Sequence, residues 1–133
     1  MQTNTYLFFN GNCKAAFEYY QQHLGGEIEM MITAAEAPAD MPSQAGFEDK
    51  IMHTRMKLGN NVLMGSDAPP DRYNKLQGFD VNITVDTPED AERVFAVLAE
   101  KGEVRMPLEQ TFWAKRFGSL VDQFGVPWMV NCE

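Results

Sequence analysis

An internal repeat constrains this chain more than any other feature of its sequence. When the first half is shifted by 76 positions, five pairs of identical or similarly apolar residues coincide without a gap: Leu7 with Ile83, Phe9 with Val85, Gly26 with Gly102, Glu27 with Glu103 and Met30 with Met106. A unit of one strand, one helix and three strands that occurs twice cannot bury its sheet alone. The two copies are therefore expected to share a core.

Hydrophobic periodicity predicts the elements of the first copy. They are a strand, a helix and three further strands over residues 6–9, 13–24, 27–33, 51–58 and 62–66. Asn12 is the predicted N-cap of the helix, and Gly25-Gly26 ends it. Prolines and glycines predict a mobile loop over residues 34–49 and a linker over 68–77.

The second copy is marked by a strong helix start. Thr87 supplies a capping hydroxyl, Pro88 suits the first helical position, and acidic residues follow in the first turn. Gly102 is expected to end this helix. Strands are predicted before and after it, over residues 79–85, 103–106 and 128–132.

Alternation of side chains separates two faces of the predicted sheet. In 79–85 the apolar residues are expected to pack under the second helix, and in 51–58 Ile51 falls on the polar side. The polar side is either a solvated sheet face or the wall of a cup-shaped pocket. That wall would include His53, Arg55, Asp80, Asn82, Thr84 and Asn131.

Charge and composition exclude several classes of protein. The net charge of −8 disfavours binding to nucleic acids and to anionic membranes. No segment has the length and hydropathy of a signal peptide or of a membrane span of roughly 18 residues. Cys13 and Cys132 are interpreted as buried free thiols of a cytoplasmic protein. Only two histidines are present, so a zinc site made of His and Cys alone would need all four residues together.

Three segments carry a family resemblance. The opening, residues 6–27, resembles that of vicinal oxygen chelate (glyoxalase/bleomycin resistance/dioxygenase) proteins. More restrictive are Met52-His53-Thr54 followed by residues 64–67, and the long segment 110–131, QTFWAKRFGSLVDQFGVPWMVN. Together they are similar to the PhnB-like branch of that superfamily over nearly the whole chain.

The resemblance implies an α+β fold with two tandem βαβββ modules, residues 1–67 and 78–133, in a single domain covering 1–133. It also implies an eight-stranded curved mixed sheet around a cavity, and a homodimer. Members of this branch have been labelled 3-demethylubiquinone-9 3-methyltransferases. The chain contains no strand followed by a Gly-rich loop that could hold S-adenosylmethionine.

Family members that bind a metal take one ligand from each of four strands. Motif matching places those positions near Thr5, Met64, Asp80 and Met129. Of these, only Asp80 is a competent ligand for a hard cation, since two positions are methionines. We therefore expect neither a metal nor another cofactor.

Most of the remaining candidates have two interpretations. His53 is a general base or a hydrogen-bonded structural histidine. Phe112 and Trp113 stack on a ligand or close the core. His23 caps a helix. Lys115 and Arg116 are solvated or attract an anion, and Asp67 and Asp122 bind backbone amides at turns or act in catalysis.

We thus predict a small-molecule-binding protein with tentative base His53 and ligand contacts from Arg55, Met64, Asp80, Asn82, Phe112, Trp113, Met129 and Asn131. The alternative is a non-catalytic protein that sequesters a cationic drug, as in bleomycin resistance, and a metal-dependent glyoxalase or dioxygenase comes third.

Overall fold

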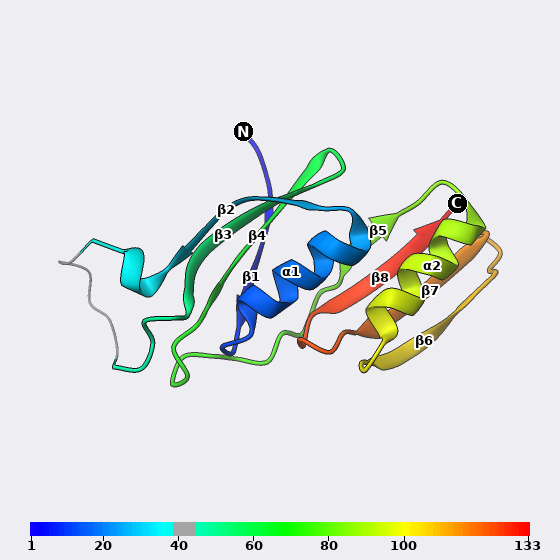
Figure 1. Ribbon diagram of the computed structural model, residues 1–133. Coiled ribbons are helices and arrows are strands. Elements are labelled where there is room, and N and C mark those ends of the chain that lie inside the picture. Colours follow the sequence, from blue (N-terminus) through cyan, green and yellow to red (C-terminus); the bar gives the residue numbers. More distant parts are fainter. Residues whose placement is uncertain (39–44) are drawn as a thin grey trace. The chain divides into compact units, whose positions relative to one another are not determined.

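A computed structural model describes residues 1–38 and 45–133 of the chain. The chain divides into two compact units, Met1–Asn74 and Lys75–Glu133, which are called unit 1 and unit 2 below and are described separately. Each unit consists of one long helix lying on a four-stranded sheet (Figure 1). No helix in the described ranges is long and apolar enough to cross a membrane.

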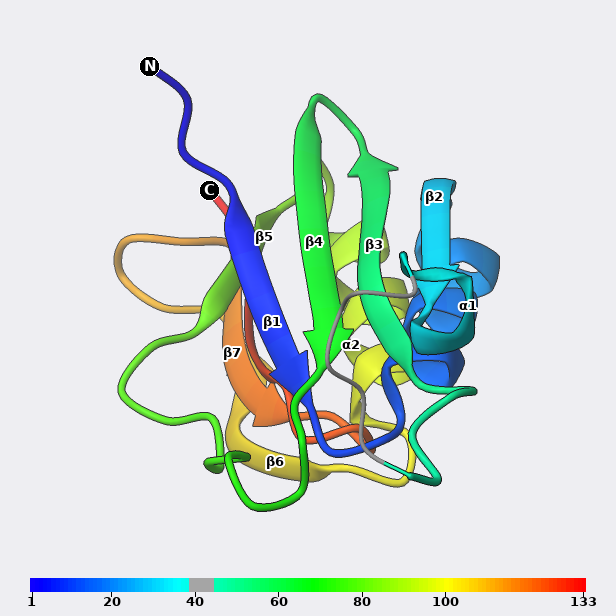
Figure 2. The same ribbon diagram turned by 90° about the vertical axis from the view of Figure 1, so that its left-hand side faces the viewer.

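Unit 1 contains the first predicted βαβββ set, with a short 3₁₀ turn, η1, after its second strand. Its elements are β1 (Thr5–Phe9), α1 (Cys13–Leu24), β2 (Glu27–Thr33), η1 (Ala34–Glu36), β3 (Ile51–Leu58) and β4 (Asn61–Asp67). The strands lie in the order β1-β4-β3-β2, as Figure 2 shows. β1 is parallel to β4, and the other neighbours are antiparallel.

Unit 2 has the same topology. Its elements are β5 (Val81–Thr84), α2 (Pro88–Ala99), β6 (Glu103–Glu109), β7 (Arg116–Val121) and β8 (Pro127–Cys132). The order is β5-β8-β7-β6, and β5 is parallel to β8. The expected α+β architecture with two βαβββ modules is therefore confirmed, with the eight strands forming two four-stranded sheets in the described ranges.

The repeat includes a β-bulge in each unit, which the sequence pattern did not predict. The shift of 76 carries β2 onto β6 residue for residue. Each strand also shifts register at the same place, between Ile28 and Met30 in β2 and between Val104 and Met106 in β6. An extra residue at a bulge increases the local twist of a strand. Glu29 and Arg105 occupy this bulged position in the two units.

Gly26 and Gly102, which the repeat aligns, both lie close to other atoms of their units. A Cβ on Gly26 would lie 2.6 Å from the sulfur of Met56. One on Gly102 would collide with the carbonyl oxygen of Val121 and lie 3.0 Å from Cα of Asp122. The first obstacle is a flexible side chain, whereas the second is backbone.

The helix termini confirm some capping predictions and correct others. The hydroxyl of Thr87 accepts a hydrogen bond from the backbone N–H of Asp90 at 3.1 Å, and Gly25 ends α1 with a φ of 76°. Asn12 makes no side-chain cap. The N–H of Cys13 instead donates to Asp67 Oδ1 at 3.0 Å, so the capping carboxylate comes from the end of β4.

Each sheet has one face covered by its helix and one open face. In unit 1 the covered face carries Leu7, Phe9 and Met56, which are buried with Ala16, Phe17 and Tyr20 of α1. In unit 2, α2 packs mainly on β7 and β8, and its buried partners include Leu120, Trp128, Val130 and Cys132. The open faces hold the polar residues that sequence alternation predicted.

Several predicted boundaries were wrong for identifiable reasons. β6 continues through Pro107 to Glu109 because it is an edge strand, where a proline costs no ladder bond on the outer side. β5 is shorter than predicted. Ile51 is fully buried, because a register shift between Ile32 and Thr33 interrupts alternation at the start of β3. The predicted loop 34–49 begins with η1, and its residues 39–44 lie outside the described part.

Candidate functional site: the open sheet faces

The open face of unit 1 centres on a pair formed by Tyr6 and His53. The phenol oxygen of Tyr6 lies 3.1 Å from Nδ1 of His53. The two rings are nearly parallel, with an interplanar angle of 17° and centroids 5.7 Å apart. Because β4 separates β1 from β3 in the sheet, the contact bridges two strands that are not neighbours. His53 is thereby held in a defined orientation.

Apolar groups surround this pair. Phe8, two residues beyond Tyr6 on β1, is 50% exposed, and its ring lies 5.1 Å from that of Tyr6. Met64 on β4 is aligned with Tyr6 on one side and with Arg55 on the other, so all three side chains emerge on the same face. The surface combines aromatic and thioether groups with a single imidazole.

Arg55 is held by a carboxylate. Its Nε lies 3.1 Å from Oε1 of Glu29, the bulged residue of β2, and both side chains are about two-fifths exposed (40% and 41%). Solvent screens such a pair, so it contributes little to stability. It does fix the guanidinium at the border of the open face and leaves its remaining N–H groups available to a ligand.

The open face of unit 2 carries amides in place of the imidazole. Asn82 Nδ2 donates to Thr84 Oγ1 at 3.0 Å. Strand register aligns Asn82 with Met129, and Thr84 with Asn131. The side-chain oxygen of Asn131 is buried and accepts no hydrogen bond from the described residues. A buried acceptor without a donor is unfavourable, so this atom is a candidate contact for a ligand N–H or O–H.

Asp80 is paired with a cation of its own unit. Its Oδ1 lies 3.5 Å from a terminal nitrogen of Arg105, with 21% and 42% of the two side chains exposed. Arg105 is the bulged residue of β6, at the opposite edge of the sheet from β5. The sequence did not indicate Arg105 as a partner. The ion pair partly compensates the negative charge of Asp80.

Phe112 and Trp113 lie in the segment between β6 and β7. Phe112 is 97% exposed and Trp113 is 52% exposed, so they do not close a core within their unit. Their rings meet edge to face with centroids 4.7 Å apart, and Trp113 lies 5.5 Å from Phe117 on β7. The three rings form a continuous aromatic group, of which Phe112 and Trp113 are exposed.

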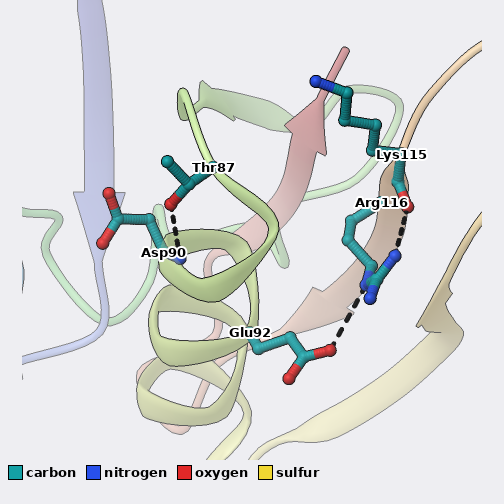
Figure 3. A network of polar contacts seen from close by, with 5 residues as sticks. All are labelled: Thr87, Asp90, Glu92, Lys115 and Arg116. Atoms are coloured by element: carbon teal, nitrogen blue, oxygen red, sulfur yellow. Dashed lines mark hydrogen bonds and ion pairs between the residues drawn. The ribbon is translucent and has the colours of Figure 1, made fainter.

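Other charged candidates have structural roles. Arg116 at the start of β7 contacts Glu92 of α2 at 3.2 Å and donates to the carbonyl of Lys115 at 2.7 Å (Figure 3). Both carboxylates near turns bind backbone amides: Asp67 accepts from Cys13 and Ile51, and Asp122 accepts from Phe124 and Val126. His23 contacts Tyr19 at the end of α1, with the two rings tilted by 45° and their centroids 4.3 Å apart.

Both cysteines are buried free thiols, as predicted. Burial raises the pKa of Cys13, and the negative charge of nearby Asp67 raises it further. A protonated, inaccessible thiol is a poor nucleophile. Cys13 is thus a core residue.

The donor atoms at the family's metal positions do not suit a divalent cation. Strand register shows that the β1 residue beside Met64 is Tyr6, since Thr5 is aligned with Leu63. Motif matching gave a position near Thr5, and Tyr6 is the residue in register with Met64. The groups available are a phenol, two thioethers and a carboxylate already paired with Arg105, whereas hard cations require several oxygen or imidazole ligands. The described residues contain no cluster of three or more His, Cys, Asp or Glu side chains that could hold a metal.

A pocket of about 360 Å³ lies in unit 1. It borders the start of α1 and is lined by Asn10, Gly11, Asn12, Ala45, Gly46, Phe47, Lys50, Ala68 and Pro70. None of the residues predicted to bind a ligand lines it.

Reasoning from the sequence missed Tyr6, Phe8, Glu29, Arg105 and Phe117. The alternation of β1 contained a usable signal, because Tyr6 and Phe8 must face away from the buried Leu7 and Phe9. Glu29 and Arg105 could not be found in this way, since their positions depend on bulges.

Comparisons with known proteins give a consistent picture. The family model of the Glyoxalase/Bleomycin resistance protein/Dioxygenase superfamily matches residues 2–130. Protein YjdN from Escherichia coli (strain K12) is 37% identical over 139 residues, which cover 98% of this chain and 95% of that protein. The crystal structure of protein PA1353 from Pseudomonas aeruginosa has a TM-score of 0.90 and 48% identity, covering 100% of this chain and 98% of the other. A PhnB protein from Bacillus cereus shares the fold, with a TM-score of 0.83, 24% identity and 100% coverage of both chains.

Proposed function

Because this chain belongs to the glyoxalase/bleomycin resistance protein/dioxygenase superfamily, we propose that it binds a small organic molecule on its open sheet faces without a divalent metal ion. We also place it in the PhnB-like branch. The observation that carries the proposal is the pair of Tyr6 and His53, a hydrogen-bonded polar group among exposed apolar side chains. Sites for organic ligands combine mostly apolar walls with a few fixed polar groups.

The proposed contacts have distinct roles. In unit 1, His53 exchanges a hydrogen bond or a proton with the ligand, while Met64 supplies apolar surface and Arg55 a partly neutralised charge. In unit 2, the proposed contacts are Asp80, Asn82, Phe112, Trp113, Met129 and Asn131. The aromatic residues among them suit a flat apolar group, and the amides suit polar substituents.

No step through a metal ion is proposed, because the donor set offers thioethers and a phenol where oxygen and imidazole ligands would be needed. Any chemistry would have to use the side chains themselves. Fold alone does not separate an enzyme from a binding protein. A sequestration protein is the second candidate, since the net charge of −8 favours a cationic compound.

We further propose that the protein acts as a homodimer. Several large apolar side chains that are not proposed ligand contacts are exposed in the single chain, among them Phe79, Val104 and Met106. Exposed apolar groups of this size commonly mark an interface. Light scattering of the purified protein tests this, and a monomer at micromolar concentration would contradict it.

The binding proposal is tested by thermal unfolding with a panel of small organic acids, carbonyl compounds and cationic drugs including bleomycin. A ligand at one hundred times its Kd stabilises a protein by about 2.7 kcal/mol, so a specific compound should raise the Tm clearly. Phe8→Lys, which adds a cation to the open face, should abolish the rise. Ala15→Lys adds the same charge on the exposed side of α1 and should preserve it.

An equal rise in Tm in both variants would show that the ligand does not bind on the open face of unit 1. No rise in Tm with any compound of the panel would contradict the binding proposal. Mass spectrometry of the compound after incubation then separates the two functions. Recovery of unchanged compound identifies sequestration, whereas conversion to product identifies an enzyme.

A further inference from the structure

We propose that Tyr6 fixes the tautomer of His53, so that the imidazole presents its Nε2–H as a hydrogen-bond donor to an oxygen atom of the bound molecule. Tyr6 is then a positioning residue that acts through His53. The statement about the ligand rests on the function proposed above, whereas the statement about the tautomer concerns the free protein alone.

The geometry limits the possible arrangements to two. The 3.1 Å separation between the phenol oxygen of Tyr6 and Nδ1 of His53 is a hydrogen-bond distance, so one of these atoms carries the shared hydrogen. Either the phenol donates and Nδ1 accepts, or Nδ1–H donates to the phenol oxygen. The rings are near-parallel, 17° apart, and Nδ1 is the imidazole atom that contacts the hydroxyl.

Chemistry favours donation by the phenol. The unprotonated nitrogen of a neutral imidazole has a basic lone pair, as the usual pKa of about 6.5 for its conjugate acid shows. A phenol, with a usual pKa of about 10, is a competent donor, and its oxygen lone pair is partly delocalised into the ring. The stronger acceptor of the two is therefore the imidazole nitrogen. Nδ1 accepts, and the single proton of the neutral ring resides on Nε2.

This assignment changes the role predicted for His53. A general base needs a lone pair directed at the substrate, but the lone pair of Nδ1 is occupied by Tyr6, and Nε2 already carries a proton. His53 is instead an N–H donor. It recognises an acceptor oxygen, such as that of a carbonyl, a carboxylate or a phosphonate, and the exposed Phe8 beside Tyr6 provides apolar contact for the rest of the molecule.

The tautomer is measured by two-dimensional ¹H–¹⁵N correlation of the imidazole nitrogens in the full-length protein at pH 8.5. The chain has only two histidines, so His23→Gln assigns the remaining signals to His53. The expected pattern is an unprotonated Nδ1 and a protonated Nε2. A protonated Nδ1 would overturn the proposal.

Two tyrosine variants test the part played by Tyr6. Tyr6→Phe removes only the hydroxyl and should move the Nδ1 resonance of His53, because the donor is lost. Tyr19→Phe removes the hydroxyl beside the other histidine and should leave His53 unchanged. An unchanged Nδ1 resonance in Tyr6→Phe, in a variant with a wild-type amide spectrum elsewhere, would show that Tyr6 does not position the ring.

The donor role is tested with two probes of similar size, acetophenone and ethylbenzene, which differ in a carbonyl oxygen. Acetophenone should shift the Nε2 resonance of His53 in a saturable way, and ethylbenzene should not. Equal effects, or none from either probe, would overturn the donor role and leave the tautomer to the first measurement. Failure of the wider function would appear separately, in the thermal panel.

Discussion

The indole Nε1 of Trp128 donates a hydrogen bond to Oδ2 of Asp122 at 2.8 Å, and both residues are buried. The other carboxylate oxygen accepts from the backbone N–H groups of Phe124 and Val126, each at 2.9 Å. Three donors thus surround one buried carboxylate, which offsets the cost of removing its charge from water. The arrangement joins the turn before β8 to the strand itself.

Replacement of Asp122 should therefore destabilise the fold strongly. Asp122→Ala removes the acceptor of three hydrogen bonds and should lower the free energy of unfolding by about 4 kcal/mol, whereas Trp128→Phe should cost about 2 kcal/mol. Urea denaturation measures both. Asp71→Ala, at an exposed position, serves as the control and should change stability by less than about 0.5 kcal/mol. A stability loss for Asp122→Ala as small as that of the control would refute this account of the turn.

The two aligned glycines should respond differently to a methyl group. Gly102→Ala forces Cβ against the carbonyl of Val121 and should cost about 3 kcal/mol, in the range of severe overpacking. Gly26→Ala meets the end of the Met56 side chain, which can turn away, so about 1 kcal/mol is expected. Thermal unfolding measures the loss of stability in both variants. Equal losses would contradict this account, because they would mean that the backbone near Val121 moves as readily as the Met56 side chain.

The buried thiols should resist modification in the native state. Because burial raises the pKa of Cys13, with a smaller contribution from Asp67, little thiolate forms at pH 8, where an exposed thiol reacts readily. Cys132 is protected by burial. Titration with a thiol-specific chromogenic reagent should give almost no fast reaction in the folded protein and two equivalents after denaturation. One fast-reacting equivalent in the native protein would disprove this placement.

The donor set at the family's metal positions predicts weak metal binding. Protein stripped with a chelator, incubated with Mn²⁺, Ni²⁺ or Zn²⁺ and then desalted should retain much less than one equivalent by elemental analysis. Its Tm should also stay unchanged, because the described residues offer no tight site whose binding energy would stabilise the folded state. One retained equivalent that disappears in Met64→Ala or Asp80→Ala would contradict our interpretation of these positions.

Much of the fold followed from local signals. Periodicity, the Thr87-Pro88 start and the two-glycine stop at Gly25 are determined by neighbouring residues, and both helices begin where they were expected. The second helix ends at Ala99, before the expected stop at Gly102. The repeat supplied the order of elements along the chain, but β7 was not predicted, and neither was the order of strands within each sheet. What the sequence could not reveal depends on contacts between distant segments: Asp67 replaces Asn12 as the cap of α1, although 54 positions separate it from Cys13.

The difference between local signals and contacts of distant segments also explains which features of the candidate site could be predicted. Alternation placed His53, Asn82 and Asn131 on open faces, because side chains on a strand emerge on alternate sides. It could not show which groups pair. Asp80 was expected to be available to a ligand, but Arg105 reaches it from a bulge on the opposite edge strand. Tyr6 was counted as part of a strand, and its link to His53 follows from the strand order.

Calorimetric titration of the most stabilising compound from the thermal panel tests the central claim most directly, with wild type, His53→Ala and His23→Ala in parallel. The open face around His53 is the proposed binding surface, so His53→Ala should weaken binding at least tenfold, about 1.4 kcal/mol. His23→Ala, which removes the histidine at the end of α1, should bind like wild type. If His53→Ala binds the compound with wild-type affinity, the open face of unit 1 is not the ligand site.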